Sequence, residues 1–319
     1  MNKGLIFTLN LLEHKEIQLE NNQTKNSWLH LDYKNPDTKL WLLEESGLPK
    51  DVCYAFLDSN STNRFILKEN GFFFVFRALN FNEGQKKEDM VSLHIWIEND
   101  RIITMRDQKI RGIDELKNII INKKKNTTTK HIFLEILDKL TDITSSYIDE
   151  LYDNVDEIDE ILIENFTKGL RYRISRLRKK IIELRRFIMP QKTLLEQIYK
   201  ENVFSNGEKT YLKNILEHNY KITEDLSALR ERANVSQEEF TAKIGDQMTK
   251  TMYVLAILST IFLPLNFIAS LLGVNVSGIP GASNPNAFLI VCIIVIIIGI
   301  IEYLWFKKNR YFLFLIIAS

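Results

Sequence analysis

The sequence predicts an α+β domain, followed by a long helical stalk and two transmembrane helices. Three observations indicate this fold class. Alternating apolar residues and turn signals occupy the first part of the 319-residue chain. From residue 131 onward the apolar residues recur every three or four positions, which is the period of a helix. Two long apolar runs, Met252–Leu272 and Ala287–Phe306, then follow one another near the end of the chain.

Residues 1–125 are expected to form the α/β domain, on the cytoplasmic side for the reason given below. Trp28–Asp32 is typical of a short strand. Pro36 marks the start of a helix, because proline suits the first helical turn. A polar linker near residues 123–130 ends the domain.

Residues 91–105 predict an antiparallel hairpin, since apolar residues alternate around an Asn99-Asp100 turn. This alternation places His94 on the polar face of its strand, where a lone histidine is usually structural or merely exposed, and we assign it no function. Asp114 is expected to cap a helix that runs through Ile121.

Residues 131–206 are expected to form a cytoplasmic antiparallel helical hairpin. Every charged residue in 142–164 is acidic, whereas 168–186 is basic apart from Glu183. Opposite charges favour the pairing of two helices joined by a short turn at residues 167–169. An alternative interpretation is that the acidic helix holds hydrated divalent ions.

A single helix is expected over residues 208–272. Pro190 predicts a kink or break in the helix before it, and residues 205–207 end the hairpin. No proline or clear cap intervenes between residue 208 and the first apolar run. The helix would be about 97 Å long and would carry a conformational change directly into the membrane.

The two apolar runs, 252–272 and 287–306, are expected to cross the membrane. The first has no charged residue, and as a helix it spans about 31 Å, the thickness of a bilayer core. The loop between them, 273–286, is uncharged, whereas basic residues flank the runs on their other side. Short basic flanks stay in the cytoplasm, so both termini are predicted there, in a multi-pass protein of the cytoplasmic (inner) membrane. These flanking residues are Lys243 and Lys250, and, in the C-terminal end 307–319, Lys307, Lys308 and Arg310.

The first span carries a polar stripe. Its members step by three or four residues and so share one face: Thr249, Met252, Ala256, Thr260, Leu263 and Asn266. One interpretation is that these residues pack and hydrogen-bond between helices, and the other is that they line a water-filled pore. Pro264 leaves a helical carbonyl unpaired, which the Thr260 hydroxyl is placed to satisfy.

Composition argues against several function classes. A net charge of +1 does not suit a nucleic-acid binder. The two cysteines, Cys53 and Cys292, form neither a disulfide framework nor a CxxC metal site. No phosphate loop, nucleophile elbow or zinc-protease spacing occurs. We therefore expect neither an enzyme nor a resident cofactor.

At the end of the first span the chain resembles the CorA-type divalent metal ion transporters. Gly273-Val274-Asn275 stands where that family has Gly-Met-Asn. Three stretches look like the zinc transporter branch of the family, ZntB: residues 28–33 with Pro36-Asp37, residues 186–191, and the continuation 276–281. The resemblance covers nearly the whole chain.

The resemblance implies a homopentamer in the lipid bilayer, whose first-span helices line a central pore. Asn275 would form a ring of amide oxygens that holds a hydrated metal ion at the outer mouth. Gly273 would let the backbone leave the helix as a C′ glycine. The polar stripe occupies the family's pore-facing positions, with Met252 and Leu263 as apolar constrictions.

The ion is predicted to be Zn²⁺ on branch resemblance, with proton coupling as a further expectation. The alternative is a CorA-type magnesium or cobalt channel, because no Cys or His lines the predicted pore. A second alternative is a membrane-tethered sensor or scaffold that conducts nothing. Glu302 is a candidate proton-responsive residue, or else it pairs with Lys307 and Lys308 at the membrane edge. The apolar tail 311–319 has no functional explanation.

Overall fold

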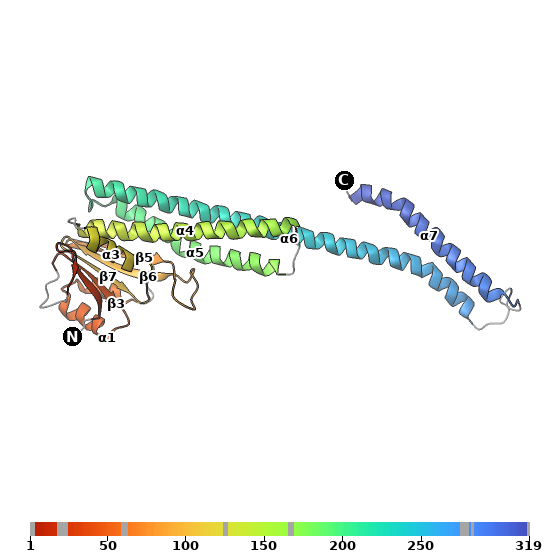
Figure 1. The fold of residues 1–319 in the computed structure, drawn as a ribbon, viewed down its shortest axis with the longest axis horizontal. Helices are drawn as coiled ribbons and strands as arrows, with labels where there is room; N and C mark the ends of the chain where they lie inside the picture. The colour runs from red at the N-terminus through yellow and green to blue at the C-terminus, as the bar shows by residue number, and fades with distance from the viewer. Residues whose placement is uncertain are drawn as a thin grey trace. The chain divides into compact units, whose positions relative to one another are not determined.

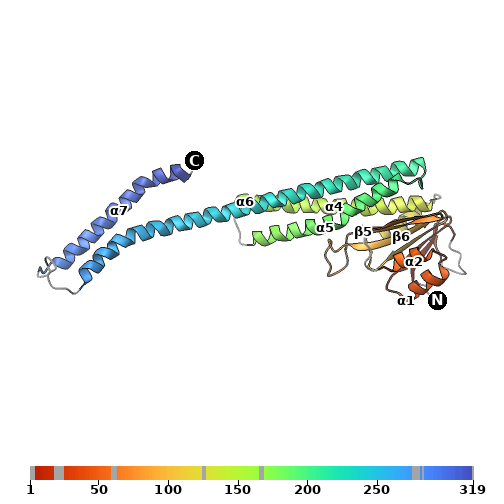
Figure 2. The same cartoon turned by 180° about the vertical axis from the view of Figure 1, so that it is seen from behind.

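The computed structural model describes residues 4–17, 25–58, 63–123, 127–164, 169–274, 281 and 284–317. The chain divides into two compact units, residues 1–238 and 239–319. The first unit contains a sheet with helices on both faces, and the second contains two apolar helices (Figures 1 and 2). One helix, α6, spans Asn206–Gly273 and belongs to both units.

The sheet has seven strands in the order β2-β1-β3-β7-β6-β5-β4. Neighbouring strands are antiparallel except β3 and β7, which are parallel. The strands are β1 Leu5–Asn10, β2 Lys15–Glu16, β3 Ser27–Asp32, β4 Phe65–Lys68, β5 Gly71–Ala78, β6 Val91–Glu98 and β7 Arg101–Arg106.

Helices cover both faces of this sheet. One face is covered by three short helices that follow one another in the chain, α1 (Pro36–Leu40), η1 (Trp41–Glu45) and α2 (Lys50–Leu57). Phe73 and Trp96 of the sheet pack in a core there with Trp41 of η1 and Phe56 of α2. On the other face, Phe72 and its neighbours pack against α3 (Ile113–Lys123), α4 (Thr129–Glu164), α5 (Leu170–Lys200) and α6. Successive strand residues point to opposite faces, and both faces are covered, which explains why β5 is apolar from Phe72 to Phe76.

His94 is buried, so the structural one of its two expected roles applies. Its side chain is 5% exposed, and Nδ1 lies 2.9 Å from the carbonyl oxygen of Phe56. Its strand does not meet solvent on this face, because Phe56 and the rest of α2 cover it. Burial lowers the pKa of His94 from 6.5 to about 4.

The helices α4, α5 and α6 lie side by side and alternate in direction (Figures 1 and 2). The charge pairing predicted between α4 and α5 is sparse among the described side chains, where Arg173 and Glu157, 2.6 Å apart, form the single ion pair. Arg232 of α6 instead holds both Asp156 and Asp159 of α4, each at 2.7 Å. The proposed turn at 167–169 lies mostly outside the described residues.

Two local predictions differ from the structure. Helix α5 continues through Pro190 instead of ending there, because the buried residues Ile188 and Gln191 hold it against the rest of the unit. Asp114 lies inside the first turn of α3, which begins at Ile113, so it does not cap that helix. A carboxylate in the first turn still interacts favourably with the helix dipole.

Helix α6 contains the predicted span 252–272. Helix α7, Ala287–Ile317, contains the predicted span 287–306 and continues into the C-terminal tail. Both helices include a stretch that is long and apolar enough to cross a membrane. The structure also has the predicted order of α+β domain, long helix and two apolar helices.

Lowering the pH should destabilise the first unit through His94. Between pH 6.5 and about 4 the unfolded chain binds a proton at this residue that the folded chain does not, so stability falls as the pH falls, by about 3 kcal/mol in total. Denaturant unfolding of the detergent-solubilised chain, followed by tryptophan fluorescence from pH 7.5 to 4.5, measures this slope. His94→Gln should reduce this slope, and the slope that remains should come from His30, whose pKa burial also lowers. An unchanged slope in His94→Gln contradicts the assignment.

Candidate functional site

In the second unit, one side of α6 packs against α7. The partly buried residues of α6 recur every three or four positions and are Tyr253, Ile257, Ile261, Pro264, Leu265 and Ile268. A Cβ atom added at Gly299 of α7 would lie 3.8 Å from Cδ1 of Leu265, so the helices are in contact there. The partly buried residues of α7 form a matching face of Ala287, Val291, Cys292, Val295, Ile298, Gly299 and Glu302.

The predicted polar stripe lies on the side of α6 that α7 leaves uncovered. All six of its residues are exposed: Thr249, Met252, Ala256, Thr260, Leu263 and Asn266. The two predicted constrictions, Met252 and Leu263, are 66% and 74% exposed. Within the second unit, this face is therefore free to contact water, lipid or another copy of the chain.

The hydroxyl of Thr260 does not have the predicted role. It donates a 2.8 Å hydrogen bond to the carbonyl oxygen of Ala256, one turn earlier. The carbonyl that Pro264 leaves unpaired is that of Thr260 itself, and a threonine on a helix reaches the carbonyl four residues back. Because its hydroxyl is already bonded, Thr260 needs no pore to explain it.

Asn266 does need an explanation. Its amide is exposed and has no hydrogen-bond partner among the described residues. An unpaired amide in hydrocarbon costs roughly 2–7 kcal/mol. Asn266 follows Leu265 by one residue and so points about 100° away from the contact with Gly299. Its partner must be water or another chain, since α7 lies elsewhere.

An open hollow of about 550 Å³ lies beside Asn266 at the level of Pro264. Its lining consists of Leu263, Pro264, Asn266, Phe267 and Ser270. Sequence reasoning missed Phe267 and Ser270. The sequence pattern could have indicated Ser270, because this residue lies four positions after Asn266 and so continues the stripe.

The outer end of α6 is only partly described. Gly273 is the last residue of α6, and its backbone does not adopt a left-handed conformation, so it is not a C′ glycine as the resemblance implied. Val274 is 51% exposed, and Asn275 lies outside the described residues. At the start of α7 the side chain of Asn284 accepts a hydrogen bond from the backbone N–H of Asn286, 2.9 Å away.

Glu302 lies on the face of α7 that meets α6. Its Oε2 is enclosed and has no hydrogen-bond partner among the described residues. An ionisable side chain at membrane depth is costly and usually faces a neighbouring helix or a water-filled cavity. Lys308 is exposed, whereas the side chains of Lys307 and Arg310 are not described, so the structure does not test an ion pair with them.

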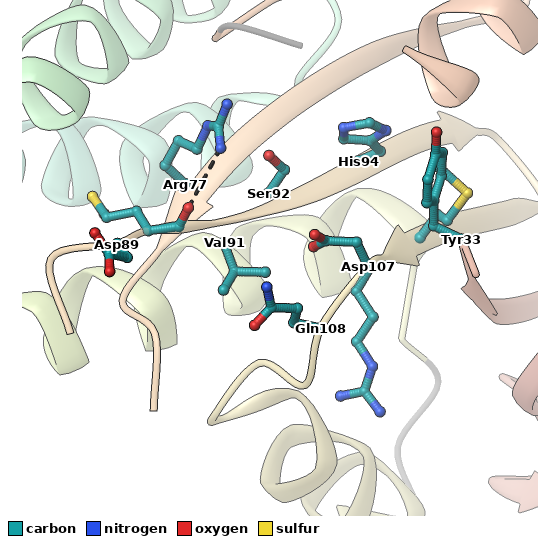
Figure 3. A pocket seen from close by; sticks show the side chains of 11 residues that line it. Tyr33, Arg77, Asp89, Val91, Ser92, His94, Asp107 and Gln108 are labelled. Atoms are coloured by element: carbon teal, nitrogen blue, oxygen red, sulfur yellow. Dashed lines mark hydrogen bonds between the residues drawn. The ribbon is translucent and has the colours of Figure 1, made fainter. Parts of the chain in front are cut away.

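A separate cavity of about 110 Å³ lies in the first unit, at the ends of β5, β6 and β7 (Figure 3). Arg77, Ser92, His94 and Asp107 line it, and the Arg77 guanidinium donates to the carbonyl of Met90 at 3.4 Å. This volume holds only about three or four waters, and small-molecule sites are usually 300 Å³ or more. Across the described ranges, no three His, Cys, Asp or Glu side chains gather as a metal site.

Comparison with known proteins places these features in context. Residues 23–308 match the family of CorA-like Mg²⁺ transporter proteins. The chain is 28% identical to the zinc transport protein ZntB of Photorhabdus laumondii, over 89% of this chain and 87% of that protein. It is 29% identical to the divalent cation transporter CmaX of Pseudomonas aeruginosa, over 89% and 86% of the two chains.

Solved structures share the fold. The structure of full-length CmaX matches with a TM-score of 0.80 and 27% identity, over 97% of this chain and 99% of that one. The CorA magnesium transporter of Methanocaldococcus jannaschii matches with a TM-score of 0.82 and 18% identity, over 95% and 97% of the chains. The second likeness shows the fold alone.

The contact at Gly299 gives a direct test of the α6–α7 packing. Gly299→Leu should push Leu265 away and lower the free energy of unfolding of the solubilised chain by about 1–3 kcal/mol, as overpacked contacts do. This loss should appear as a lower melting temperature. Gly299→Ala is the matched control, because its Cβ fits at 3.8 Å. Equal melting temperatures for the leucine and alanine variants would refute this packing.

Proposed function

Because this chain belongs to the family of CorA-like Mg²⁺ transporter proteins, we propose that it transports divalent metal ions across the cytoplasmic membrane. The observation that carries the proposal is the exposed amide of Asn266 on the face of α6 away from α7. A membrane anchor gains nothing from an unpaired amide, whereas a water-filled pathway satisfies it. This observation weighs against the non-conducting scaffold.

The pathway runs along the stripe from Thr249 to Asn266, and the hollow at Pro264 forms part of it. Several copies of the chain, five by analogy with the family, surround a common axis with these stripes inward. Met252 and Leu263 form apolar constrictions that close the path by expelling water. Asn275, with Gly273 and Val274, holds the hydrated ion at the outer mouth, and both termini lie in the cytoplasm.

Zn²⁺ is the proposed ion. The name of the ZntB relative supports zinc, while the name of CmaX supports divalent cations more broadly. The proposed path contains neither Cys nor His, which zinc usually takes as ligands once dehydrated. The ion therefore passes with its water shell, held by amide oxygens. Magnesium, which sheds water reluctantly, is the alternative.

Glu302 is the proposed proton-responsive group. Its enclosed Oε2, which lacks a hydrogen-bond partner among the described residues, supports this role, because ionisable side chains inside a membrane are costly and are retained mainly where they function. A proton gradient would then act on the contact between α6 and α7, where Glu302 lies.

Metal flux into proteoliposomes tests the proposed function. We expect the purified chain to carry Zn²⁺, faster with an inward proton gradient, and we expect Asn275→Ala to reduce the rate at least tenfold. Glu302→Gln should remove the effect of the gradient and leave uptake without it unchanged. The control is Asn286→Ala, an exposed amide at the start of α7.

Two results would change this assignment. Mg²⁺ uptake that depends only on its own gradient would identify a magnesium channel. No flux of either ion, from protein shown to be folded and oligomeric, would favour the scaffold.

A further inference from the structure

The outer face of α4 carries a row of carboxylates without partners. Asp149, Asp153 and Glu160 are exposed, and their steps of four and seven residues place them on one face. Within the described part of the chain, none of the three forms a side-chain hydrogen bond or ion pair. Exposed like charges four residues apart on a helix repel one another. The fold of one chain therefore leaves this acidic row uncompensated.

A basic groove lies between α5 and α6. Arg178, Ile182 and Arg185 line it from α5, and Arg230 and Asn234 line it from α6. Its volume is about 300 Å³, and no carboxylate lines it. The guanidinium of Arg185 is positioned by a 2.6 Å hydrogen bond to the hydroxyl of Ser227. Ile182 is 58% exposed, so an apolar side chain also remains uncovered there.

The acidic row and the basic groove cannot meet within one chain. The neighbours of the row show where α4 contacts the other helices, because Glu157 reaches Arg173 of α5 and Asp156 reaches Arg232 of α6. The row lies between these contacts on the outer side of α4. The groove opens between α5 and α6, on the side of the three helices away from α4.

We propose that the acidic row of one copy packs into the basic groove of the next copy. Asp153 and Glu160 are seven residues apart, as are Arg178 and Arg185, and this spacing is about 10.5 Å on either helix. A helix of a second copy can thus place one carboxylate at each end of the groove, over Ile182. Exposed ion pairs contribute little stability each, so the match sets register and partner, while coverage of the groove adds stability.

This contact joins two different surfaces and therefore repeats from copy to copy. Heterologous contacts form a ring when the rotation closes and an open filament otherwise. Chains that span one membrane in one orientation are related by an axis normal to it, which is the arrangement that permits closure into a ring. The inference concerns how copies recognise each other and is independent of which ion is transported.

Disulfide cross-linking of the full chain tests the contact. In a Cys292→Ser background, where Cys53 is buried, the pair Asp153→Cys and Ile182→Cys should give a ladder of covalent multimers on mild oxidation. Either cysteine alone should give no ladder. The control pair, Asp153→Cys with Tyr172→Cys, uses an α5 residue that is 71% exposed but outside the groove, and it should remain monomeric on denaturing gels. A test pair that behaves as this control does would overturn the proposal.

Charge exchange keeps the test valid if a variant folds poorly. Arg178→Glu with Arg185→Glu should lose at least half of the ladder from that cysteine pair, and adding Glu160→Arg and Asp149→Arg should restore it. The matched reversal, Lys179→Glu with Arg186→Glu, has the same seven-residue spacing on another face of α5 and should have no effect. Loss of the ladder without restoration would overturn the proposal. The proposal would also be overturned if the groove bound inorganic phosphate and the charge-reversed chain still cross-linked fully.

Discussion

An unpaired amide is costly to place in the hydrocarbon of a membrane, and the arrangement of the second unit depends on this constraint. Helix α6 buries one face against α7 and keeps Asn266 on another. The hydroxyls of Thr251 and Thr260 bond to carbonyls of their own helix and are compatible with lipid. Asn266 has no such bond, and its desolvation would cost several kcal/mol. Water or a second chain must lie beside it.

The first unit shows a similar imbalance in charge. Arg232 and Arg173 neutralise the carboxylates of α4 that they reach, Asp156, Asp159 and Glu157, whereas the outer row on α4 and the groove on α5 and α6 keep opposite, uncompensated charges. Both units thus present surfaces that one chain cannot satisfy alone. A single explanation, assembly of copies around a common axis, accounts for both.

The sequence was informative where one physical signal dominates. Hydropathy and length were enough for the two apolar helices, and three-to-four spacing was enough for the stripe that α7 leaves uncovered. It failed where a distant segment decides the outcome. The pattern around His94 left a structural and an exposed position equally open, because the cover comes from α2, some forty residues earlier. A break at Pro190 was one expectation, and the burial of Gln191 that accompanies the continuous helix is not visible locally. The acidic helix α4 pairs through Asp156 and Asp159 with Arg232 of α6, a third helix beyond the predicted hairpin of α4 and α5. No local pattern in the sequence contains that information.

The most direct measurement of the central claim is the reactivity of single cysteines along α6 toward a charged, membrane-impermeant thiol reagent. The full chain would be assayed in liposomes, in the Cys292→Ser background, with the reagent on either side of the membrane. The account predicts fast labelling at Ala256, Thr260, Leu263 and Asn266, and slow labelling at Ile257, Ile261 and Ile268 against α7. Labelling that ignores the face of the helix, or that avoids the stripe, would contradict a water-filled path along α6.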